Sequence, residues 1–250
     1  MVERLRVASF NIRTSNGQDG RNRWWWRRRV CAAGIRGFEA DVVGLQEVRP
    51  LQLAYLRRAL PGYAFVGRGR DRDGGGEHAS VLVGPSWTVE SHETRWLSER
   101  PDVPGSIGWD AGLTRIATLV RLQRGATRLG IANAHFDSRG RQAREHSAVL
   151  LAEWLHAETD RPWLVLGDLN AQPRSVPLRT LTAAGFADPL PPDAGGTEHG
   201  FTGATDRTRI DYVLAGPGVQ VTSARIEHPR PHGRLPSDHW PVLADVEVGD

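Results

Sequence analysis

The chain has 250 residues, 39% of them hydrophobic, so it is long enough to bury a substantial core without a partner. Its 32 basic residues are all arginine and its formal charge is only +3, so the basic character of the sequence reflects arginine usage more than a strongly positive surface. The single cysteine, Cys31, excludes an internal disulfide, and no apolar stretch approaches the length of a membrane span.

The amino-terminal stretch MVERLRVASFNI becomes strand-like within a few positions and lacks the long apolar segment of a secretory signal. We therefore expect a cytoplasmic protein with no membrane span and no obligate protein partner. No internal repeat, long low-complexity tract or linker divides the sequence, and we expect residues 1–250 to form a single domain.

Strand-length apolar runs and amphipathic helical patterns recur along the whole chain. In chain order, the expected elements are a strand at 5–12, a helix at 25–38, a strand at 41–48, a helix at 50–60, strands at 79–84, 116–122 and 128–136, a helix at 141–158, a strand at 163–170, a helix at 176–185, and strands at 209–215 and 240–248. Some strands are separated by hairpin-length gaps and others by helices, which favours a mixed α/β sandwich over strict strand–helix alternation.

The stretch RNRWWWRRRV, residues 21–30, sets three tryptophans among five arginines. Successive helical residues are about 100° apart, so the three rings cannot all face one core or one ligand. A buried Trp24 with its neighbours at the rim is the favoured interpretation, and a stacking platform for bases is the alternative. The core-facing side of this helix would carry Trp24, Arg27, Cys31, Ile35 and Phe38.

Strand after strand ends in a carboxylate, an amide or an imidazole. These polar residues are Asn11, Glu47, His135, Asp168, Asn170, Asp211, Asp238 and His239. Taken singly each has an ordinary explanation: Asp168 and Asn170 after WLVLG fit an Asx turn, and a lone histidine is more often structural than catalytic. On one continuous strand, however, Asp168 and Asn170 would point the same way, because side chains alternate with period two.

The co-occurrence of these residues favours a functional site. Several carboxylates converging on one end of a sandwich would repel one another unless a cation lay among them. An all-oxygen ligand set is typical of Mg²⁺, with Mn²⁺ as the alternative, whereas the absence of thiolates and the spacing of the histidines argue against zinc. Such a site suits metal-assisted attack of water on a phosphate ester.

The motifs SFN, LQE, AHFD, GDLN, RIDY and SDHWPV occur in this order between residues 5 and 247. Together they resemble the endonuclease/exonuclease/phosphatase superfamily, which includes deoxyribonuclease I-like nucleases and several phosphatases. The resemblance implies an α/β fold, a four-layer sandwich of two mixed β-sheets packed face to face and flanked by helices. Residues 96–122 and the stretch HGFTG at 199–203 are similar to an uncharacterised bacterial branch, although ASVLV replaces the aromatic-rich strand common there.

The resemblance also implies roles for individual residues. Glu47 would be the principal metal ligand, with Asn11 and Asp238 completing the metal environment. Asp168 and Asn170 would orient the attacking water and the phosphate.

Two histidines would face the phosphate if the resemblance holds. His239, held by Asp211, would stabilise the phosphoryl oxygens or transfer a proton. His135 would be a second phosphate-facing imidazole, and Glu77 stands where its carboxylate partner is expected. A histidine backed by a carboxylate stays protonated to higher pH, as phosphate binding requires.

Three further residues are candidate substrate contacts. Arg115 would lie near the scissile phosphate, and Trp109 and His199 would lie at the mouth of the site. A structural ion pair and ordinary loop packing explain these residues equally well. In the family a tryptophan followed three residues later by arginine opens the first helix, which matches Trp24 and Arg27.

The resemblance implies a metal-dependent phosphoric ester hydrolase. The leading hypothesis is a Mg²⁺-dependent nuclease that cuts DNA or RNA, with the arginine-rich loops at 67–72 and 139–144 contacting backbone phosphates. The alternative is a phosphatase or phosphodiesterase acting on a small molecule or lipid headgroup, which the modest net charge favours. A catalytically inactive binding module is disfavoured, because all eight motif positions keep competent side chains.

Overall fold

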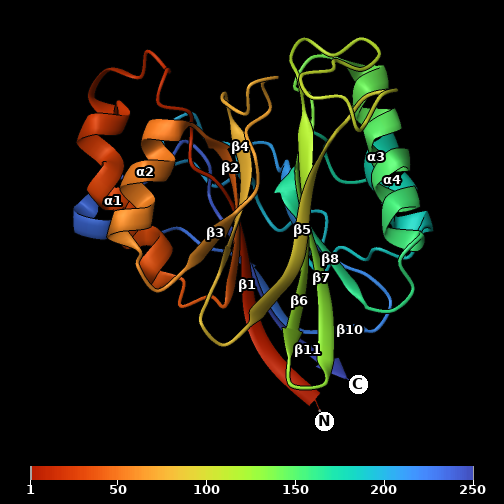
Figure 1. Ribbon diagram of the computed structural model, residues 1–250. Coiled ribbons are helices and arrows are strands. Elements are labelled where there is room, and N and C mark those ends of the chain that lie inside the picture. The colour runs from red at the N-terminus through yellow and green to blue at the C-terminus, as the bar shows by residue number, and fades with distance from the viewer. Residues whose placement is uncertain (1, 250) are drawn as a thin grey trace.

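The computed structural model describes residues 2–249, which form two mixed β-sheets packed face to face (Figure 1). The strand order is β10-β11-β1-β2-β4-β3 in one sheet and β5-β6-β7-β8-β9 in the other. The six-stranded sheet consists of β1 (Val2–Asn11), β2 (Val42–Val48), β3 (Ala64–Val66), β4 (His78–Val83), β10 (Val219–Ile226) and β11 (Val242–Gly249). The five-stranded sheet consists of β5 (Thr88–Trp96), β6 (Ile116–Arg124), β7 (Thr127–His135), β8 (Trp163–Asp168) and β9 (Asp211–Ala215).

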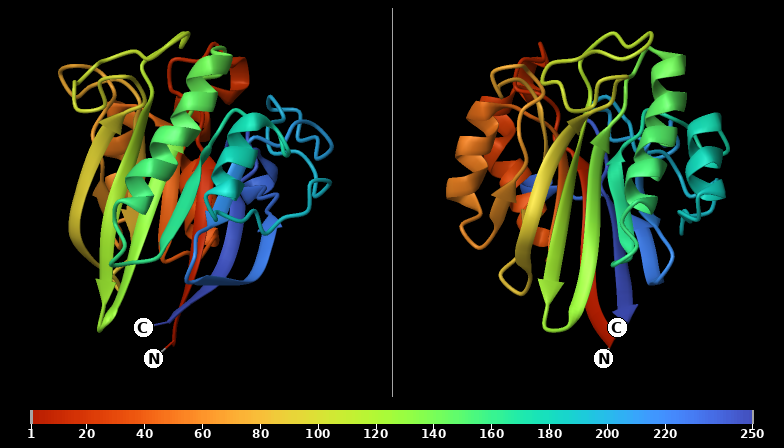
Figure 2. Two further views of the ribbon diagram at one scale, coloured as in Figure 1. Left: turned by 90° about the vertical axis from the view of Figure 1, so that its right-hand side faces the viewer. Right: turned by 45° about the vertical axis from the view of Figure 1, so that its right-hand side comes forward.

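Helices cover both outer faces of this pair of sheets (Figures 1 and 2). The six-stranded sheet is covered by α1 (Trp24–Gly37) and α2 (Pro50–Ala59), and the five-stranded sheet by α3 (Arg141–His156) and α4 (Val176–Ala183). Two short 3₁₀ turns, η1 (Gly20–Asn22) and η2 (Pro231–Gly233), lie close to α1. This is the four-layer α/β sandwich that the resemblance implied. Within residues 2–249, no helix is both long and apolar enough to cross a membrane.

Buried side chains fill three interiors, one between the sheets and one beneath each helical layer. On β1, Val7 packs between the sheets with Ile131 and Leu164, whereas the next residue, Ala8, faces the helices with Ile35. Central strands are therefore buried on both faces and read as continuous apolar runs, which explains why the sequence predicted them.

The three strands that the sequence did not predict, β3, β5 and β10, all lie at the edges of the sheets. An edge strand needs no apolar residues on its solvent-facing side. β5 has the sequence TVESHETRW, in which most residues are exposed or half-buried, and β10 is similarly polar. These strands form because a neighbouring strand pairs with their backbone, a constraint that a pattern of apolar residues does not show.

A bulge interrupts the pairing of β2 with β4 at the end of β2 that leads to Glu47. The register passes from the pair Leu45–Ser80 to the pair Val48–His78, so two residues of β2 oppose one residue of β4. Bulges redirect side chains and are common beside active sites. Here Glu47 adopts a left-handed backbone conformation with φ of 61°, which is costly for a residue other than glycine.

The side chain of Asn133 supports this bulge from the opposite sheet. Its amide nitrogen donates to the backbone carbonyls of Leu45 and Ser80 at 3.0 and 2.9 Å, and its oxygen accepts from Gln46 Nε2 at 2.7 Å. Gly44 permits this close approach, because a Cβ there would lie 2.9 Å from Asn133 Oδ1. Asn133 thus links the two sheets by hydrogen bonds within an otherwise apolar interior.

We expect Asn133→Ala to lower the free energy of unfolding by about 2–4 kcal/mol, because it leaves buried donors and acceptors without partners. Urea denaturation of the purified variants measures this loss. Ser80→Ala is the matched control: in the part of the chain that the structure describes, its buried hydroxyl has no hydrogen-bond partner. Removing that hydroxyl should change stability by less than about 0.5 kcal/mol. Equal losses in the two variants would contradict this role of Asn133.

Candidate active site

The structure brings the predicted strand-end residues together at one end of the sandwich. Asn11 ends β1, His135 ends β7, Asp168 ends β8 and Asp211 begins β9. In the strand registers, Asp168 lies opposite His135 on one side and Asp211 on the other. A hydrogen bond of 2.9 Å from Asn11 Nδ2 to Asp168 Oδ2 connects the two sheets at this point. The convergence of the strand ends therefore creates one site between the sheets.

The carboxylate of Glu47 is held at both oxygens. Asn11 Nδ2 donates to Glu47 Oε1 at 3.0 Å, and the backbone N–H of Thr14 donates to Oε2 at 2.7 Å. Asn11 thus bridges Glu47 and Asp168 through its amide nitrogen, while its oxygen accepts from the Arg13 backbone. In this orientation Asn11 positions two carboxylates, and its role as a metal ligand stays a prediction.

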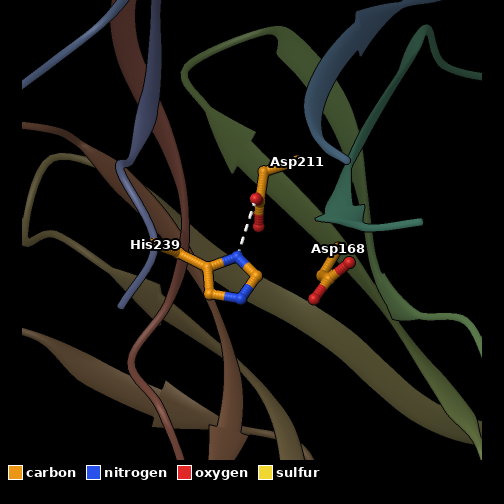
Figure 3. Close-up of side chains that lie close together, drawn as sticks. All are labelled: Asp168, Asp211 and His239. Carbon is orange, nitrogen blue, oxygen red and sulfur yellow. Dashed lines mark hydrogen bonds and ion pairs between the residues drawn. The ribbon is translucent and has the colours of Figure 1, made fainter. Parts of the chain in front are cut away.

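Asp168, Asp211 and His239 form the buried centre of the site, and their side chains point toward one another (Figure 3). His239 Nδ1 lies 2.8 Å from Asp211 Oδ2. The backbone N–H groups of Ile210 and Asp211 both donate to the hydroxyl of Thr197, which fixes the start of β9. The aspartate therefore orients the imidazole from behind, as the resemblance implied.

The protonation of this centre follows from its burial and charges. Burial raises the pKa of Asp168 to about 7, and the charge of Asp211 adds to this effect. Burial by itself would lower the pKa of His239, but the charge and hydrogen bond of Asp211, together with Asp238 and Asp168, raise it well above its usual value. His239 is thus an imidazolium at neutral pH, facing a carboxylate that titrates near neutrality.

The donor set fits a divalent cation. One side-chain atom from each of Asp168, Asp211 and His239 lies within 4.8 Å of the others. An imidazolium has no free lone pair, so at neutral pH the two carboxylates, and not His239, would bind the cation. Within residues 2–249, Asp211 Oδ1 is buried without a hydrogen-bond partner. Two buried carboxylates held side by side repel each other, and a cation with a preference for oxygen relieves that repulsion. This group differs from the predicted ligand set of Glu47, Asn11 and Asp238, although the hydrogen bonds of Asn11 join the two sets.

Asp238 lies at the edge of the same site. Its Oδ1 lies 3.2 Å from the hydroxyl of Ser237, which donates to the backbone carbonyl of Asn11 at 2.6 Å. Its Oδ2 is 3.6 Å from Arg13 Nε. The segment before β11 is thereby tied to the end of β1, where the metal environment was predicted.

His135 has a different partner from the one predicted. Arg115 Nη1 lies 3.2 and 3.1 Å from its two ring nitrogens, and no ion pair joins it to Glu77 among residues 2–249. Glu77 instead pairs with Arg70 at 2.6 Å. Burial and then the charge of Arg115 hold the pKa of His135 well below its usual value. The expected contact between Glu77 and His135 is therefore replaced by the contact with Arg115, and Asp168 Oδ2 lies 3.6 Å from His135 Nε2. The roles of His135 and Glu77 in catalysis stay predictions.

Asn170 does not continue the strand that ends in Asp168. β8 ends at Asp168, and Asn170 has a left-handed φ of 45°. The Asn170 backbone N–H donates to Asp168 Oδ1 at 3.0 Å, which is the Asx turn considered for this pair. The period-two argument therefore does not apply, yet the turn orients the Asp168 carboxylate. The Asn170 side chain donates to the Phe136 carbonyl at 3.0 Å.

The two residues predicted at the mouth make structural contacts. His199 is fully buried, stacks on Trp240 at 4.2 Å between ring centroids, and accepts a hydrogen bond from the Gly203 backbone. This placement corrects the expectation of a mouth residue, because a fully buried ring cannot contact a substrate outside. Trp109 is half-buried and stacks on His146 of α3 at 4.7 Å. Its role in substrate binding stays a prediction.

The side chains of the tryptophan-rich stretch, residues 21–30, differ in burial as helical geometry predicts. All five residues of the expected core face, from Trp24 to Phe38, are buried. Trp25 and Trp26 are 61% and 68% exposed. The guanidinium of Arg27 donates to the backbone carbonyls of Ile12 and Arg13, both at 2.6 Å. The first turn of α1 is thus anchored to the loop that leaves the site after Asn11.

Sequence reasoning missed three residues that shape the site. Arg13 contacts Asp238, Thr197 holds the start of β9, and Asp137 pairs with Arg115 Nε at 3.2 Å. Asp137 lies in the motif AHFD and is buried, so its position in that motif was the available signal. Arg13 and Thr197 lie in loops, where no periodicity identifies them.

Comparisons with known proteins identify the family. The family model described as Endonuclease/Exonuclease/phosphatase family matches residues 8–239, and the chain belongs to this family. It is accordingly a phosphoric ester hydrolase. No curated protein matches the sequence at a significant level.

Three solved structures illustrate the similarity. An endonuclease/exonuclease/phosphatase from Bacteroides vulgatus is 35% identical, with a TM-score of 0.88 over 99% of this chain and 100% of that chain. The mannosyl-6-phosphatase Bt3783 of Bacteroides thetaiotaomicron is 29% identical, with a TM-score of 0.88 over 97% and 99% of the two chains. D. rerio TDP2 complexed with a single strand DNA product is 19% identical, with a TM-score of 0.77 over 98% and 99%, which shows the fold alone.

Saturating Mg²⁺ or Mn²⁺ should raise the Tm of the protein by about 5 °C, because a ligand that binds only the folded state stabilises it. Glu47→Gln should lose most of this shift, since a neutral amide replaces a charged ligand of the same shape. Differential scanning calorimetry with and without the cation measures the effect. Glu153→Gln, at an exposed position on α3, is the control and should keep the full shift. An unchanged shift in Glu47→Gln would place the cation elsewhere.

Proposed function

We propose that this protein is a divalent-metal-dependent phosphoesterase acting on small phosphate esters in preference to nucleic acid. The observation that carries the catalytic part is the buried cluster of Asp168, Asp211 and His239, which Asn11 joins to Glu47. The cluster places a carboxylate, an imidazolium and a cation-binding group around one point. These are the groups that water attack on phosphorus requires.

Each residue has a distinct task in this proposal. Glu47 is the principal ligand of the cation, with Asp238 nearby, because a protonated His239 cannot ligate a metal. A bound Mg²⁺ or Mn²⁺ would supply positive charge to the phosphoryl oxygens. Asp168 takes a proton from the attacking water, and a pKa of about 7 suits a general base at neutral pH. Asn11 and the Asn170 backbone fix its two oxygens.

The reaction is a hydrolysis. The bond from the water oxygen to phosphorus forms as the P–O bond to the alcohol breaks. The departing alcohol oxygen takes up one proton from solvent, and Asp168 releases the proton that it took from the water, so the step balances. His239, oriented by Asp211, donates a hydrogen bond to a phosphoryl oxygen and offsets the charge that develops there. Positioning and electrostatics thus account for most of the catalysis.

The identity comparison supports the small-ester substrate class. The mannosyl-6-phosphatase is similar over nearly the whole of both chains at 29% identity, whereas the DNA-bound TDP2 is only 19% identical. The net charge of +3 adds no strong attraction for a polyanion. The nuclease hypothesis is the second candidate, and the exposed Trp25 and Trp26 among arginines favour it, since such rings can stack on unpaired bases.

Asp168→Asn and His239→Ala should each lower kcat by about 10²–10⁴-fold while the fold survives, because they remove transition-state contacts. EDTA should abolish turnover of the wild type. Steady-state kinetics on a chromogenic phosphate ester, with circular dichroism as the folding check, measure these effects. Asp206→Asn and His92→Ala, at exposed positions, are the controls and should retain full activity. Turnover that persists in EDTA would rule out the metal mechanism.

A substrate panel separates the two candidate functions. With Mg²⁺ present, we expect hydrolysis of small phosphate esters and no cleavage of supercoiled plasmid or single-stranded oligonucleotides. Phosphate release and gel electrophoresis measure the two outcomes. Cleavage of nucleic acid with a higher kcat/KM than the small esters would overturn the preferred substrate class in favour of the nuclease.

A further inference from the structure

Two arginines flank His135 at one end of the site, and each is held by its own carboxylate. Arg115 Nε lies 3.2 Å from Asp137 Oδ2, and Arg70 Nη1 lies 2.6 Å from Glu77 Oε2. Both guanidinium side chains are largely buried, with 6% and 12% exposure. Arg115 also contacts His135 through Nη1 and Ser138 through Nη2, so a ligand would have to share these donors, whereas Arg70 keeps donors that Glu77 does not occupy.

The loop that carries Arg70 is fixed by several hydrogen bonds. The Arg70 backbone N–H donates to the Glu77 carbonyl at 3.0 Å, and the Arg70 carbonyl accepts from Trp96 Nε1 at 2.7 Å. Trp96 is itself buried at the end of β5. The only side-chain hydrogen bond of Arg70 within residues 2–249 is the one to Glu77, so its Nε and Nη2 donors are uncommitted. These hydrogen bonds therefore fix the position of Arg70 in the folded protein.

Both arginines lie beside His135. Arg115 Nη1 is 3.2 and 3.1 Å from the two ring nitrogens of His135, and Arg70 lines the same small cavity as Arg115 and His135. Glu77 and Asp137 balance the two positive charges, so the pair would attract an anion through the donors of Arg70 that Glu77 does not occupy. His135 Nε2 is also only 3.6 Å from Asp168 Oδ2, so this anion would lie next to the catalytic carboxylate.

The space at this end is small. Arg70, Glu77, Thr114, Arg115 and His135 line a cavity of about 10 Å³, together with the adjoining parts of β4 and β6. Such a cavity holds about one water molecule. A phosphoryl oxygen can enter between the arginines, whereas a carbon substituent on that oxygen has no room.

Resting on the proposed function, we propose that Arg70, positioned by Glu77, binds a terminal phosphoryl oxygen together with Arg115, and that this pair makes the enzyme a phosphomonoesterase. A monoester presents a dianion with three unsubstituted oxygens. A diester carries one charge less and has a carbon chain on one of those oxygens. Two guanidiniums beside a cavity of this small size match the monoester in both charge and shape.

Para-nitrophenyl phosphate and bis(para-nitrophenyl) phosphate test this selectivity, since they share a leaving group and differ only in the second ester. With Mg²⁺ present, the wild type should prefer the monoester in kcat/KM by at least about tenfold. Arg70→Met should lower kcat/KM for the monoester by about 10- to 100-fold, as expected for the loss of a charge-assisted hydrogen bond, and for the diester by less than about threefold.

Further variants separate positioning from folding. Arg70→Lys should retain part of the monoester activity because it keeps the charge, and Glu77→Gln should raise KM for the monoester more than it lowers kcat. Arg58→Met is the matched control, because Arg58 is exposed on α2, and it should leave both activities unchanged. If Arg70→Met fails to fold, the Arg70→Lys and Glu77→Gln variants carry the test.

Two results would overturn the inference: a wild type that prefers the diester, or equal losses on both esters in Arg70→Met. Failure to hydrolyse either ester would refute the proposed function instead. Calorimetric titration with inorganic phosphate in the presence of Mg²⁺ then tests the pocket independently of turnover. Binding should weaken by about tenfold or more in Arg70→Met, and an unchanged affinity would also overturn the role of Arg70.

Discussion

The juxtaposition of Asp168 and Asp211 across neighbouring strands is the constraint on which the site depends. Like charges directly opposite each other on a sheet destabilise it, and burial makes the repulsion worse. The structure offsets it with the His239 imidazolium on Asp211 and the Asn11 amide on Asp168. The carboxylate of Glu47, held by the same amide, adds a further negative charge. The excess of negative charge that remains is what makes this end of the sandwich a place for a cation.

Two of the polar contacts between the sheets also lie toward this end of the molecule. Most of the inter-sheet interior is aliphatic, but Asn133 crosses it to bind the bulge in β2, and the Asn11–Asp168 bond crosses it at the site. Apolar packing allows strands to slide, whereas hydrogen bonds with defined geometry fix one arrangement. The strained backbone of Glu47 lies within that bulge. The contacts that join the sheets thus also orient the side chain of Glu47, a predicted metal ligand.

The sequence predicted the central strands, the four helices and the class of site, because burial on both faces and polar strand ends leave local patterns. It did not predict the edge strands such as β5, whose formation depends on a neighbour. Local sequence patterns also do not predict which side chains of distant loops pair with each other. The family resemblance implied that Glu77 lies beside His135, yet Glu77 pairs with Arg70, and Arg115 contacts His135. The burial of His199 against Trp240 likewise depends on how two loops fold together.

These pairings divide the site into two electrostatic halves. Glu47, Asp168 and Asp211 form a negative half that suits a cation, and Arg70 and Arg115 form a positive half that suits an anion. A phosphate ester between them would have its oxygens attracted to both sides, and the phosphorus would face a water molecule that Asp168 deprotonates. Because each arginine is fixed by its own carboxylate and each aspartate by its own donors, little reorganisation is needed when charge develops on the phosphoryl oxygens. A diester, with one charge less, would satisfy the negative half as well as a monoester does but would leave part of the positive half unpaired. We therefore expect the two arginines to determine which ester the enzyme prefers. The two aspartates would instead determine that the ester is hydrolysed.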